Sequence, residues 1–462
     1  MKIFQYLSIF FITMTSCGDK LDLKPDSYLT VPKSISDLES LLDNSDVINA
    51  TPGLSQLSAD EYHIPTLANF NALTRPMLRS TYIWDEDIYQ GMTKVPDWTV
   101  PYQQVFYANS VLDELKKMDK SSDIKAQEVM GWALFVRAYA FYSLASIYAK
   151  AFDPVSSYTD LGIPLKLNAA ITEIVPRSTV QETYNQIITD ALEASKILPT
   201  NIITDKRNRP SKTAAYAFLA RVYLSMRNYV EAEKYADLTL ELHNTLTNYN
   251  SLPIRTSSSF TYNSDEVIYF SNMRITTYSS LTYASGTLYG ILPNIVNTFQ
   301  PNDLRKAVWF RSNANGNTYI KGINSASALP FTGLATDELL YIKAECLARR
   351  SETQAAMDNI NKLLLTRWNP NATTPTKPYQ NITAINPMDA LDKVLQERKK
   401  GLLWRSTRWT DLKRLNLEGR NIVLERNIEG KTYTLEPNST KYVLPIPNDE
   451  IALSNIQQNI RK

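Results

Sequence analysis

The chain has 462 residues, of which 44% are hydrophobic and 21% charged, and its formal net charge is +2. This balance is typical of a globular protein with a large core, and it argues against a disordered chain or a nucleic-acid-binding surface. Only 13 residues are glycine and two are histidine, and no G-x-G-x-x-G, H-E-x-x-H or G-x-S-x-G pattern occurs. Glycine-cradled phosphate sites, zinc-protease sites and a serine nucleophile elbow are therefore not expected, and we expect no cofactor and no metal.

The N-terminus has the pattern of an export signal. Lys2 precedes a mostly apolar run, Ile3–Ile12, which is too short to span a bilayer. Small and polar residues then stand directly before Cys17, an order that resembles a bacterial lipoprotein signal. We expect residues 1–16 to be removed, Cys17 to be lipidated, and residues 17–45 to form a tether and N-terminal lead. The alternative is an ordinary cleaved signal with an incidental cysteine.

Helical periodicity dominates the chain that follows. Pro101 precedes one predicted helix, and Ser211 has the pattern of an N-cap for another. A lipidated Cys17 would leave Cys346 without a partner, and we expect its thiol to be a small buried group. Ser36–Leu42 reads as a short amphipathic piece of the tether. The predicted helices are Tyr102–Met118, Asp123–Ala149, Thr179–Ile197, Thr213–Met226, Tyr229–Leu242 and Asp337–Arg349.

Two helix pairs share one spacing of small residues. Ala220 precedes Ala232 by twelve positions, and Ala344 precedes Ala356 by the same number. Small residues at matched points of two adjacent helices let their backbones pack closely, as in tetratricopeptide units. The sequence therefore predicts tetratricopeptide-like helices over about 100–245 and 336–414. A coincidental helical hairpin is the alternative.

The segment between the two pairs differs in character. Residues 250–335 are rich in Ser, Thr, Asn and Tyr and have little helical period, although Glu266–Ser271 reads as a strand. Residues 369–388 read as a long loop. Glu429-Gly430 predicts a hairpin turn between two short strands. The expected fold is mostly α, with a loop-rich, partly β insertion on one side of the helices.

An ordered set of short motifs resembles the SusD/RagB family, the surface nutrient-binding lipoproteins of Bacteroidota. Each motif is weak alone, but their order over nearly the whole chain is specific. Gly401, Arg405 and Ser406 depart from the family pattern, where Glu, Glu and Gly are usual. The motifs include LDLKP after Cys17, Trp98–Tyr102, Arg137–Ala149, Leu161–Leu165, Arg209–Leu224, Asp303-Leu-Arg305, Glu338–Arg350, Glu397-Arg398, Arg408–Arg414 and Tyr442–Ile451.

The resemblance implies a SusD-like domain over 46–462, with a ligand side formed by about 250–335. It implies a non-enzymatic protein, anchored by lipid in the outer membrane and facing the exterior. Such a protein captures oligosaccharide fragments for a SusC-like TonB-dependent transporter, whose contact we assign to the tetratricopeptide-like helices. Peptide capture is one alternative. A structural lid without ligand selectivity of its own is another.

Two charged stretches are candidates for other chemistry. Residues 397–420 are basic and contain two tryptophans, which single-stranded nucleic acid would require, but Arg–carboxylate pairs within a core are the favoured interpretation. Asp85 and Glu86 lie in a run of acids. A glycosidase needs two carboxyls on opposite sides of a bond, which sequence neighbours rarely provide. We interpret this run as a solvated loop, and a hydrolase is the least favoured reading.

Aromatic residues carry the ligand-binding hypothesis. The stretch 276–290 places tyrosines among Ser and Thr without a helical stripe. Aromatic rings can cover the apolar face of a sugar while polar groups bind its hydroxyls. An extended peptide would use similar surfaces. The predicted ligand contacts are Trp84, Trp98, Tyr278, Tyr283, Tyr289 and Trp309.

Overall fold

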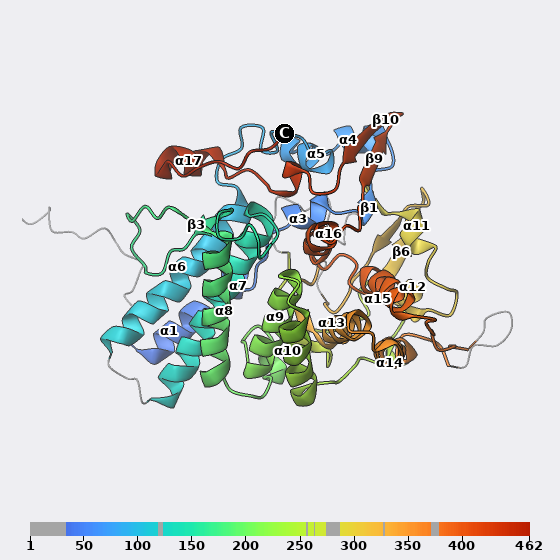
Figure 1. Ribbon diagram of the computed structural model, residues 1–462, viewed down its shortest axis with the longest axis horizontal. Coiled ribbons are helices and arrows are strands. Elements are labelled where there is room, and N and C mark those ends of the chain that lie inside the picture. The colour runs from blue at the N-terminus through green and yellow to red at the C-terminus, as the bar shows by residue number, and fades with distance from the viewer. Residues whose placement is uncertain are drawn as a thin grey trace, which may run out of the picture.

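The structure is a computed structural model that describes residues 34–118, 123–255, 257–262, 264–273, 287–326, 329–370 and 378–462. A row of antiparallel helices runs from α6 to α14, and a second layer lies across one end of this row (Figure 1). The second layer combines early and late parts of the chain, from α3–α5 and from β9, β10 and α17. The predicted signal peptide and Cys17 lie outside the described residues.

The helices of the row follow one another in the chain. They are α6 (Pro96–Lys117), α7 (Ile124–Tyr148), α8 (Val180–Ile197), α9 (Lys212–Ser225), α10 (Tyr229–Leu242), α13 (Thr336–Arg349) and α14 (Thr353–Leu365). Local signals set several of their starts. Asp123 and Ser211 cap α7 and α9 as N-cap residues, and Thr179 forms a capping box with Glu182 at α8. These starts agree with the sequence prediction within a residue or two.

One predicted start is wrong. Helix α6 begins at Pro96 rather than after Pro101, and Pro101 lies inside it. Pro96 takes the first helical position, where its missing N–H costs nothing. Pro101 lies near the start, so it removes only the hydrogen bond to the carbonyl four residues before it.

The two predicted helix pairs pack as expected. Helices α9 and α10 lie side by side, as do α13 and α14, and α10 also packs against α13. Ala220, Ala232, Ala344 and Ala356 are all 0% exposed, because they face the partner helix of their pair. The second pair therefore continues the row of the first, although the loop-rich segment separates them in sequence.

The remaining helices lie outside the row. Those before α6 are α1 (Ile35–Leu42), α2 (Ser45–Ile48), α3 (Leu54–Ser58), α4 (Leu67–Asn71) and α5 (Pro76–Tyr82). Those after α10 are α11 (Pro293–Val296), α12 (Leu304–Trp309), α15 (Pro387–Gly401), α16 (Arg408–Leu417) and α17 (Asn448–Ser454). Among the described residues, no helix is both long enough and apolar enough to cross a membrane.

All strand ladders in the described chain are two-stranded and antiparallel. Four of them pair β1 (Tyr62–His63) with β5 (Gly290–Ile291), β2 (Leu161–Pro164) with β3 (Arg177–Thr179), β4 (Val267–Tyr269) with β8 (Leu334–Ala335), and β6 (Phe310–Ser312) with β7 (Thr318–Ile320). The fifth is the predicted hairpin of β9 (Leu424–Ile428) and β10 (Lys431–Leu435). Its turn residues Glu429 and Gly430 have φ of 47° and 84°, as a type I′ turn requires.

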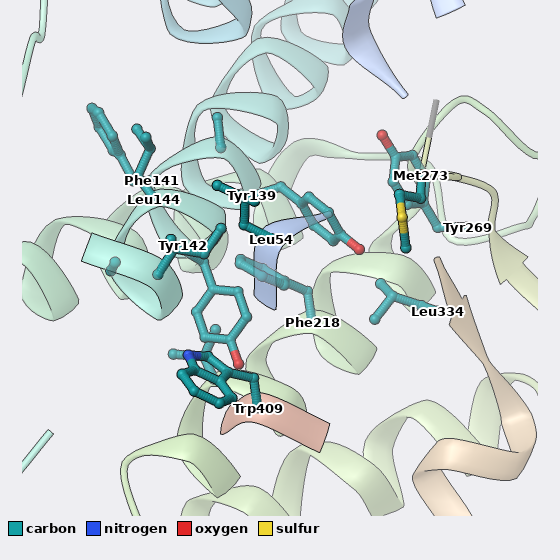
Figure 2. Packing of buried hydrophobic residues seen from close by; sticks show 14 of the residues in the cluster. Leu54, Tyr139, Phe141, Tyr142, Leu144, Phe218, Tyr269, Met273, Leu334 and Trp409 are labelled. Carbon is teal, nitrogen blue, oxygen red and sulfur yellow. The ribbon is translucent and has the colours of Figure 1, made fainter. Parts of the chain in front are cut away.

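The main core lies where α7 and α9 meet the second layer. Tyr139, Tyr142 and Phe218 pack together, with Leu54 and Trp409 beside them (Figure 2). The ring centroids of Tyr139 and Phe218 are 5.1 Å apart. These side chains join an early helix, the central row and the late helix α16 in one cluster.

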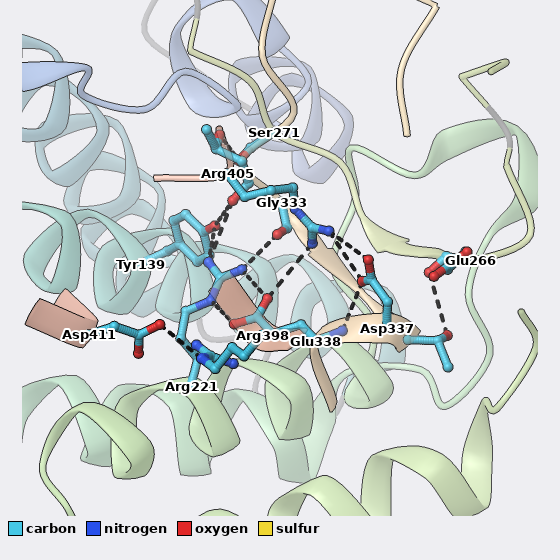
Figure 3. Close-up of polar contacts among 12 residues, drawn as sticks. Tyr139, Arg221, Glu266, Ser271, Gly333, Asp337, Glu338, Arg398, Arg405 and Asp411 are labelled. Atoms are coloured by element: carbon cyan, nitrogen blue, oxygen red, sulfur yellow. Dashed lines mark hydrogen bonds and ion pairs between the residues drawn. The ribbon is translucent and has the colours of Figure 1, made fainter. Parts of the chain in front are cut away.

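A buried ionic network replaces apolar packing between α9, α13, α15 and α16. Arg221 binds both carboxylate oxygens of Glu338, at 2.8 and 2.6 Å, while Arg398 binds Asp411 at 2.9 Å (Figure 3). Arg405 donates to Asp337 at 3.1 and 3.0 Å. The basic stretch 397–420 thus pairs largely with carboxylates of the fold, as the sequence analysis favoured.

Candidate ligand-binding site

Three of the predicted ligand contacts are core residues. Trp84 is 1% exposed and donates its indole N–H to the carbonyl of Ser58 at 2.9 Å. Tyr289 is 0% exposed and stacks on Trp404, with centroids 5.1 Å apart and planes at 12°. Trp309 is 1% exposed. Such burial leaves no ring face for a ligand and speaks against direct contact at these three positions.

The other predicted contacts differ in how they are placed. Tyr278 and Tyr283 lie outside the described residues. Trp98, on α6, lines a surface cavity of about 710 Å³. Its ring packs on Tyr102 and against the edge of Tyr148, with centroids 4.8 and 4.9 Å away, and its indole N–H points to Glu450 at 3.2 Å. Trp98 therefore forms the inner wall of this cavity and exposes little of its ring.

The rim of the Trp98 cavity is apolar. Phe106 of α6, Ile171 and Ile174 of the loop between β2 and β3, and Leu453 of α17 surround it, with exposed fractions of 37%, 81%, 63% and 78%. We call these four side chains the α6 apolar rim. Apolar side chains gathered around one hollow mark an interaction surface more often than a solvated one.

A second hollow, missed by the sequence analysis, has the chemistry of a sugar site. It measures about 450 Å³ and lies between α11, α12, α15 and the segment after α14. We call it the Trp368 depression. Trp368 and Tyr379, both partly exposed, line it with ring centroids 5.3 Å apart and planes at 60°. The amides of Asn294, Gln300, Gln380 and Gln396 and the ammonium groups of Lys399 and Lys400 complete the lining.

Tyr379 is held in place from behind. Its hydroxyl donates to the side-chain carbonyl of Asn361 on α14. The backbone N–H of Ile382 donates to the same oxygen at 2.8 Å. The ring is therefore fixed at the edge of the depression, and its orientation does not depend on a ligand.

Arg305 lines the same depression and is itself buried, at 1% exposure. Its Nε and Nη2 atoms bind Asp303 at 2.9 and 2.6 Å, and Nη2 binds Glu397 at 3.1 Å. Burial opposes the charge, but Asp303 and Glu397 outweigh it and raise the pKa of the guanidinium well above its ordinary value. Nη1 has no hydrogen-bond partner. The depression is therefore backed by a charged guanidinium whose Nη1 atom is buried.

Trp309 contributes to this arrangement indirectly. Its ring lies 5.9 Å from the guanidinium carbon of Arg305, on the side of the core, and its indole N–H donates to Tyr249 at 3.1 Å. Phe299 lies 5.1 Å from the same carbon. The predicted contact Trp309 therefore helps to position Arg305 and does not line the depression.

Two other arrangements bear on catalysis and metal binding. The carboxylate of Asp87 accepts the backbone N–H groups of Tyr89 and Gln90, as in a turn, and Glu86 is exposed. This is the solvated loop that the sequence predicts. Within the described ranges, no group of three or more His, Cys, Asp or Glu residues is arranged to hold a metal ion.

Two family models match the chain. A model described as starch-binding and associating with the outer membrane matches residues 19–224, and the SusD family model matches residues 334–461. SusD-like protein P2 of Formosa agariphila is 24% identical over 423 positions, covering 78% of this chain and 79% of that protein.

Solved structures share the fold. A SusD superfamily protein from Bacteroides vulgatus superposes with a TM-score of 0.73 at 18% identity, covering 93% of this chain and 99% of that one. A SusD-like carbohydrate binding protein from the same species gives 0.69 at 18% identity, covering 92% and 97%. The fold is thus that of the SusD superfamily. The chain belongs to the SusD/RagB family, as its motifs indicated.

Proposed function

We propose that this protein is a lipid-anchored binding protein of the outer-membrane surface that captures oligosaccharides for a SusC-like TonB-dependent transporter. Cys17 would carry the lipid. The observation that carries the ligand class is the Trp368 depression, which is lined by two aromatic rings, several amides and a charged guanidinium.

The chemistry of the depression fits a sugar. Trp368 and Tyr379 offer ring faces for the C–H face of a pyranose, and the glutamine and asparagine amides both donate and accept hydrogen bonds. Arg305 adds a positive charge at the wall of the depression, which Asp303 and Glu397 balance. A volume of about 450 Å³ accommodates a short oligosaccharide, within the usual range for ligand pockets.

The α6 apolar rim supports a separate role in docking to the transporter. It lies on the first helix of the row, whereas the Trp368 depression lies beyond the last pair. The two surfaces are therefore apart, so a ligand and a transporter can be bound together. Apolar side chains that are exposed in the free protein would be buried in the complex.

Binding of the purified protein, from residue 18 onward, to an array of plant, microbial and host glycans and to a peptide library tests the ligand class. Trp368→Ala and Tyr379→Ala should each weaken binding at least tenfold. Tyr158→Ala is the matched control, because Tyr158 is an exposed aromatic residue outside both hollows. Peptide binding without glycan binding would favour a peptide nutrient, and binding of neither would favour a structural lid.

Copurification with the transporter tests the partner independently. Leu453→Asp and Ile171→Asp should each abolish copurification of the transporter and leave glycan binding unchanged. Val230→Asp is the control, since Val230 is 77% exposed on another helix of the row, α10. If the transporter still copurifies with both of these variants, its docking surface lies elsewhere on the protein.

A further inference from the structure

The charges of the Trp368 depression are paired within the protein. Its basic lining residues are Arg305, Lys399 and Lys400. Lys400 donates to Glu397 at 2.6 Å, and Lys399 donates to Asp60 at 2.7 Å. Arg305 binds two carboxylates, as described above. A ligand in the depression therefore meets cations that already have carboxylate partners.

Arg305 in particular has no free pair of donors for an acidic ligand. A guanidinium group binds a carboxylate best through two parallel N–H groups. The Nε and Nη2 atoms of Arg305 bind Asp303, and the Nη1 atom is buried. Arg305 therefore adds positive charge to the wall of the depression but offers no accessible two-donor edge.

Lys399 is the more exposed of the two lysines, with 28% of its side chain accessible against 14% for Lys400. Its partner Asp60 also binds Arg408, which does not line the depression. Burial opposes the charge of Asp60, but Arg408 and Lys399 outweigh it and hold the pKa of this carboxyl well below its ordinary value. The carboxylate beside Lys399 is therefore ionised at neutral pH and stays paired with the ammonium group.

Glu397 is the only acid among the described residues that line the depression. One of its carboxylate oxygens accepts from Lys400 and the other from Arg305. Burial opposes its charge, but Arg305 and Lys400 outweigh it and lower the pKa of Glu397. An ionised carboxylate has further lone pairs that accept sugar hydroxyl groups, whereas it repels a second negative group brought beside it.

We propose that the Trp368 depression selects neutral oligosaccharides over acidic ones and that Glu397 is the residue that sets this preference. Glu397 cancels the charge of Lys400 and part of the charge of Arg305, so no net attraction remains for a uronate or sulfate group. Hydroxyl groups of a neutral sugar can donate to Glu397 and accept from the ammonium groups of the two lysines. This inference rests on the proposed function, because it names the class of glycan that the same site takes.

Paired glycans test the preference in the wild-type protein. Each neutral oligosaccharide of the array is compared with the same oligosaccharide after its primary hydroxyl groups have been oxidised to carboxylates, which adds charge with little change of shape. The neutral member of a pair should bind at least about tenfold more tightly than the oxidised member. Its affinity should also change less than about twofold between about 0.05 and 0.5 M sodium chloride, because no net charge is paired on binding.

The variant Glu397→Gln tests the residue. It removes the negative charge but keeps the size of the side chain, so Lys400 and Arg305 lose a counter-ion at the depression. Oxidised glycans should bind the variant at least about tenfold more tightly than they bind the wild type, and this gain should shrink at high salt. Glu436→Gln is the matched control, because Glu436 is an exposed acid outside the depression and its removal changes the net charge equally. It should keep the wild-type preference.

The possible outcomes separate this inference from the function on which it rests. A wild-type protein that binds oxidised glycans as tightly as neutral ones would overturn the preference and leave glycan capture standing. A wild-type protein that binds neither member of any pair would overturn both. A folded Glu397→Gln protein with an unchanged preference would remove Glu397 as its cause. Thermal melting shows whether the variant is folded, and if it is not, the wild-type comparison of paired glycans and its salt dependence decide the preference.

Discussion

Glu345 of α13 and Arg414 of α16 form two hydrogen bonds, of 2.6 and 2.8 Å, with both side chains buried. Arg414 also binds Asp411, which in turn binds Arg398. Removing one partner of such a pair leaves an uncompensated charge in the core. We therefore expect Glu345→Leu to lower the free energy of unfolding by about 3–5 kcal/mol.

Urea unfolding followed by circular dichroism measures this loss. Arg350→Ala is the comparison, since Arg350 pairs with Glu233 at the surface and its removal should change little. Equal losses from Glu345→Leu and Arg350→Ala would contradict the structural role of the buried pair.

Asp97 gives the stability a pH dependence. Its carboxylate accepts the N–H groups of Gly53 and Leu54, both at 2.8 Å, and burial raises its pKa to about 7. The folded protein therefore keeps a proton that the unfolded chain loses near pH 4. The stability that Asp97 contributes is complete below that pH and is lost as the pH rises to about 7.

The variant Asp97→Asn tests the direction of this pH dependence. The variant keeps an acceptor for the two N–H groups but does not titrate. Glu61 and Glu266 have pKa values raised to about 7 as well, but they are common to both proteins and cancel in the difference. The free energy of unfolding of the variant should rise relative to the wild type between pH 5 and 7.5. If the free energies of unfolding of the two proteins change with pH in parallel, Asp97 does not contribute to the pH dependence.

Gly401 is required by a neighbouring ring. A Cβ atom at this position, in the last turn of α15, would overlap the phenol group of Tyr341. Gly401→Ala should lower the free energy of unfolding by about 1–3 kcal/mol. In a double-mutant cycle with Tyr341→Ala, Gly401→Ala should lower the free energy of unfolding less than it does in the wild-type protein. Additive losses from the two substitutions would contradict the overlap.

Trp84 should act as a core residue and not as a ligand contact. The guanidinium carbon of Arg426 lies 4.8 Å from the centre of its buried ring. Trp84→Ala should destabilise the protein by about 3–5 kcal/mol. The folded fraction should still bind glycans with the wild-type affinity. A tenfold weaker affinity at full folding would restore Trp84 as a ligand contact.

The thiol of Cys346 should be unreactive in the native protein. The side chain is 2% exposed and unpaired, as the sequence predicts, and burial raises its pKa above the ordinary value. A disulfide reagent should therefore modify it only after unfolding in urea. Rapid modification of the native protein at neutral pH would contradict this placement.

Local signals explain what the sequence could predict. Each of these signals depends on three or four consecutive residues, as at the N-caps Asp123 and Ser211 and at the Glu429-Gly430 turn. They can therefore be recognised in the sequence alone. The alanine spacing spans twelve residues, which is still short enough for the sequence to predict the packing of each helix pair. The ordered family motifs then supplied the overall fold.

The Trp368 depression could not be predicted in this way. Arg305, Trp368, Tyr379 and Gln396 come from separate segments that meet only in the folded chain. The sequence also cannot distinguish an aromatic residue under a loop from one on its surface, which is why Trp84, Tyr289 and Trp309 were predicted as contacts. The burial of Trp84 and Tyr289 depends on partners more than a hundred residues away, Arg426 and Trp404.

The bonds between residues 56–61 and residues 404–408 have a consequence for biogenesis. Arg408 reaches Asp60 across 348 positions, and Trp404 reaches Glu61 across 343. The first hundred residues therefore cannot complete their packing until almost the whole polypeptide has been synthesised. For the exported lipoprotein proposed above this delay is useful, because a chain that has folded early cannot cross a membrane. Truncated products that lack α16 would expose unpaired acids and be open to proteolysis.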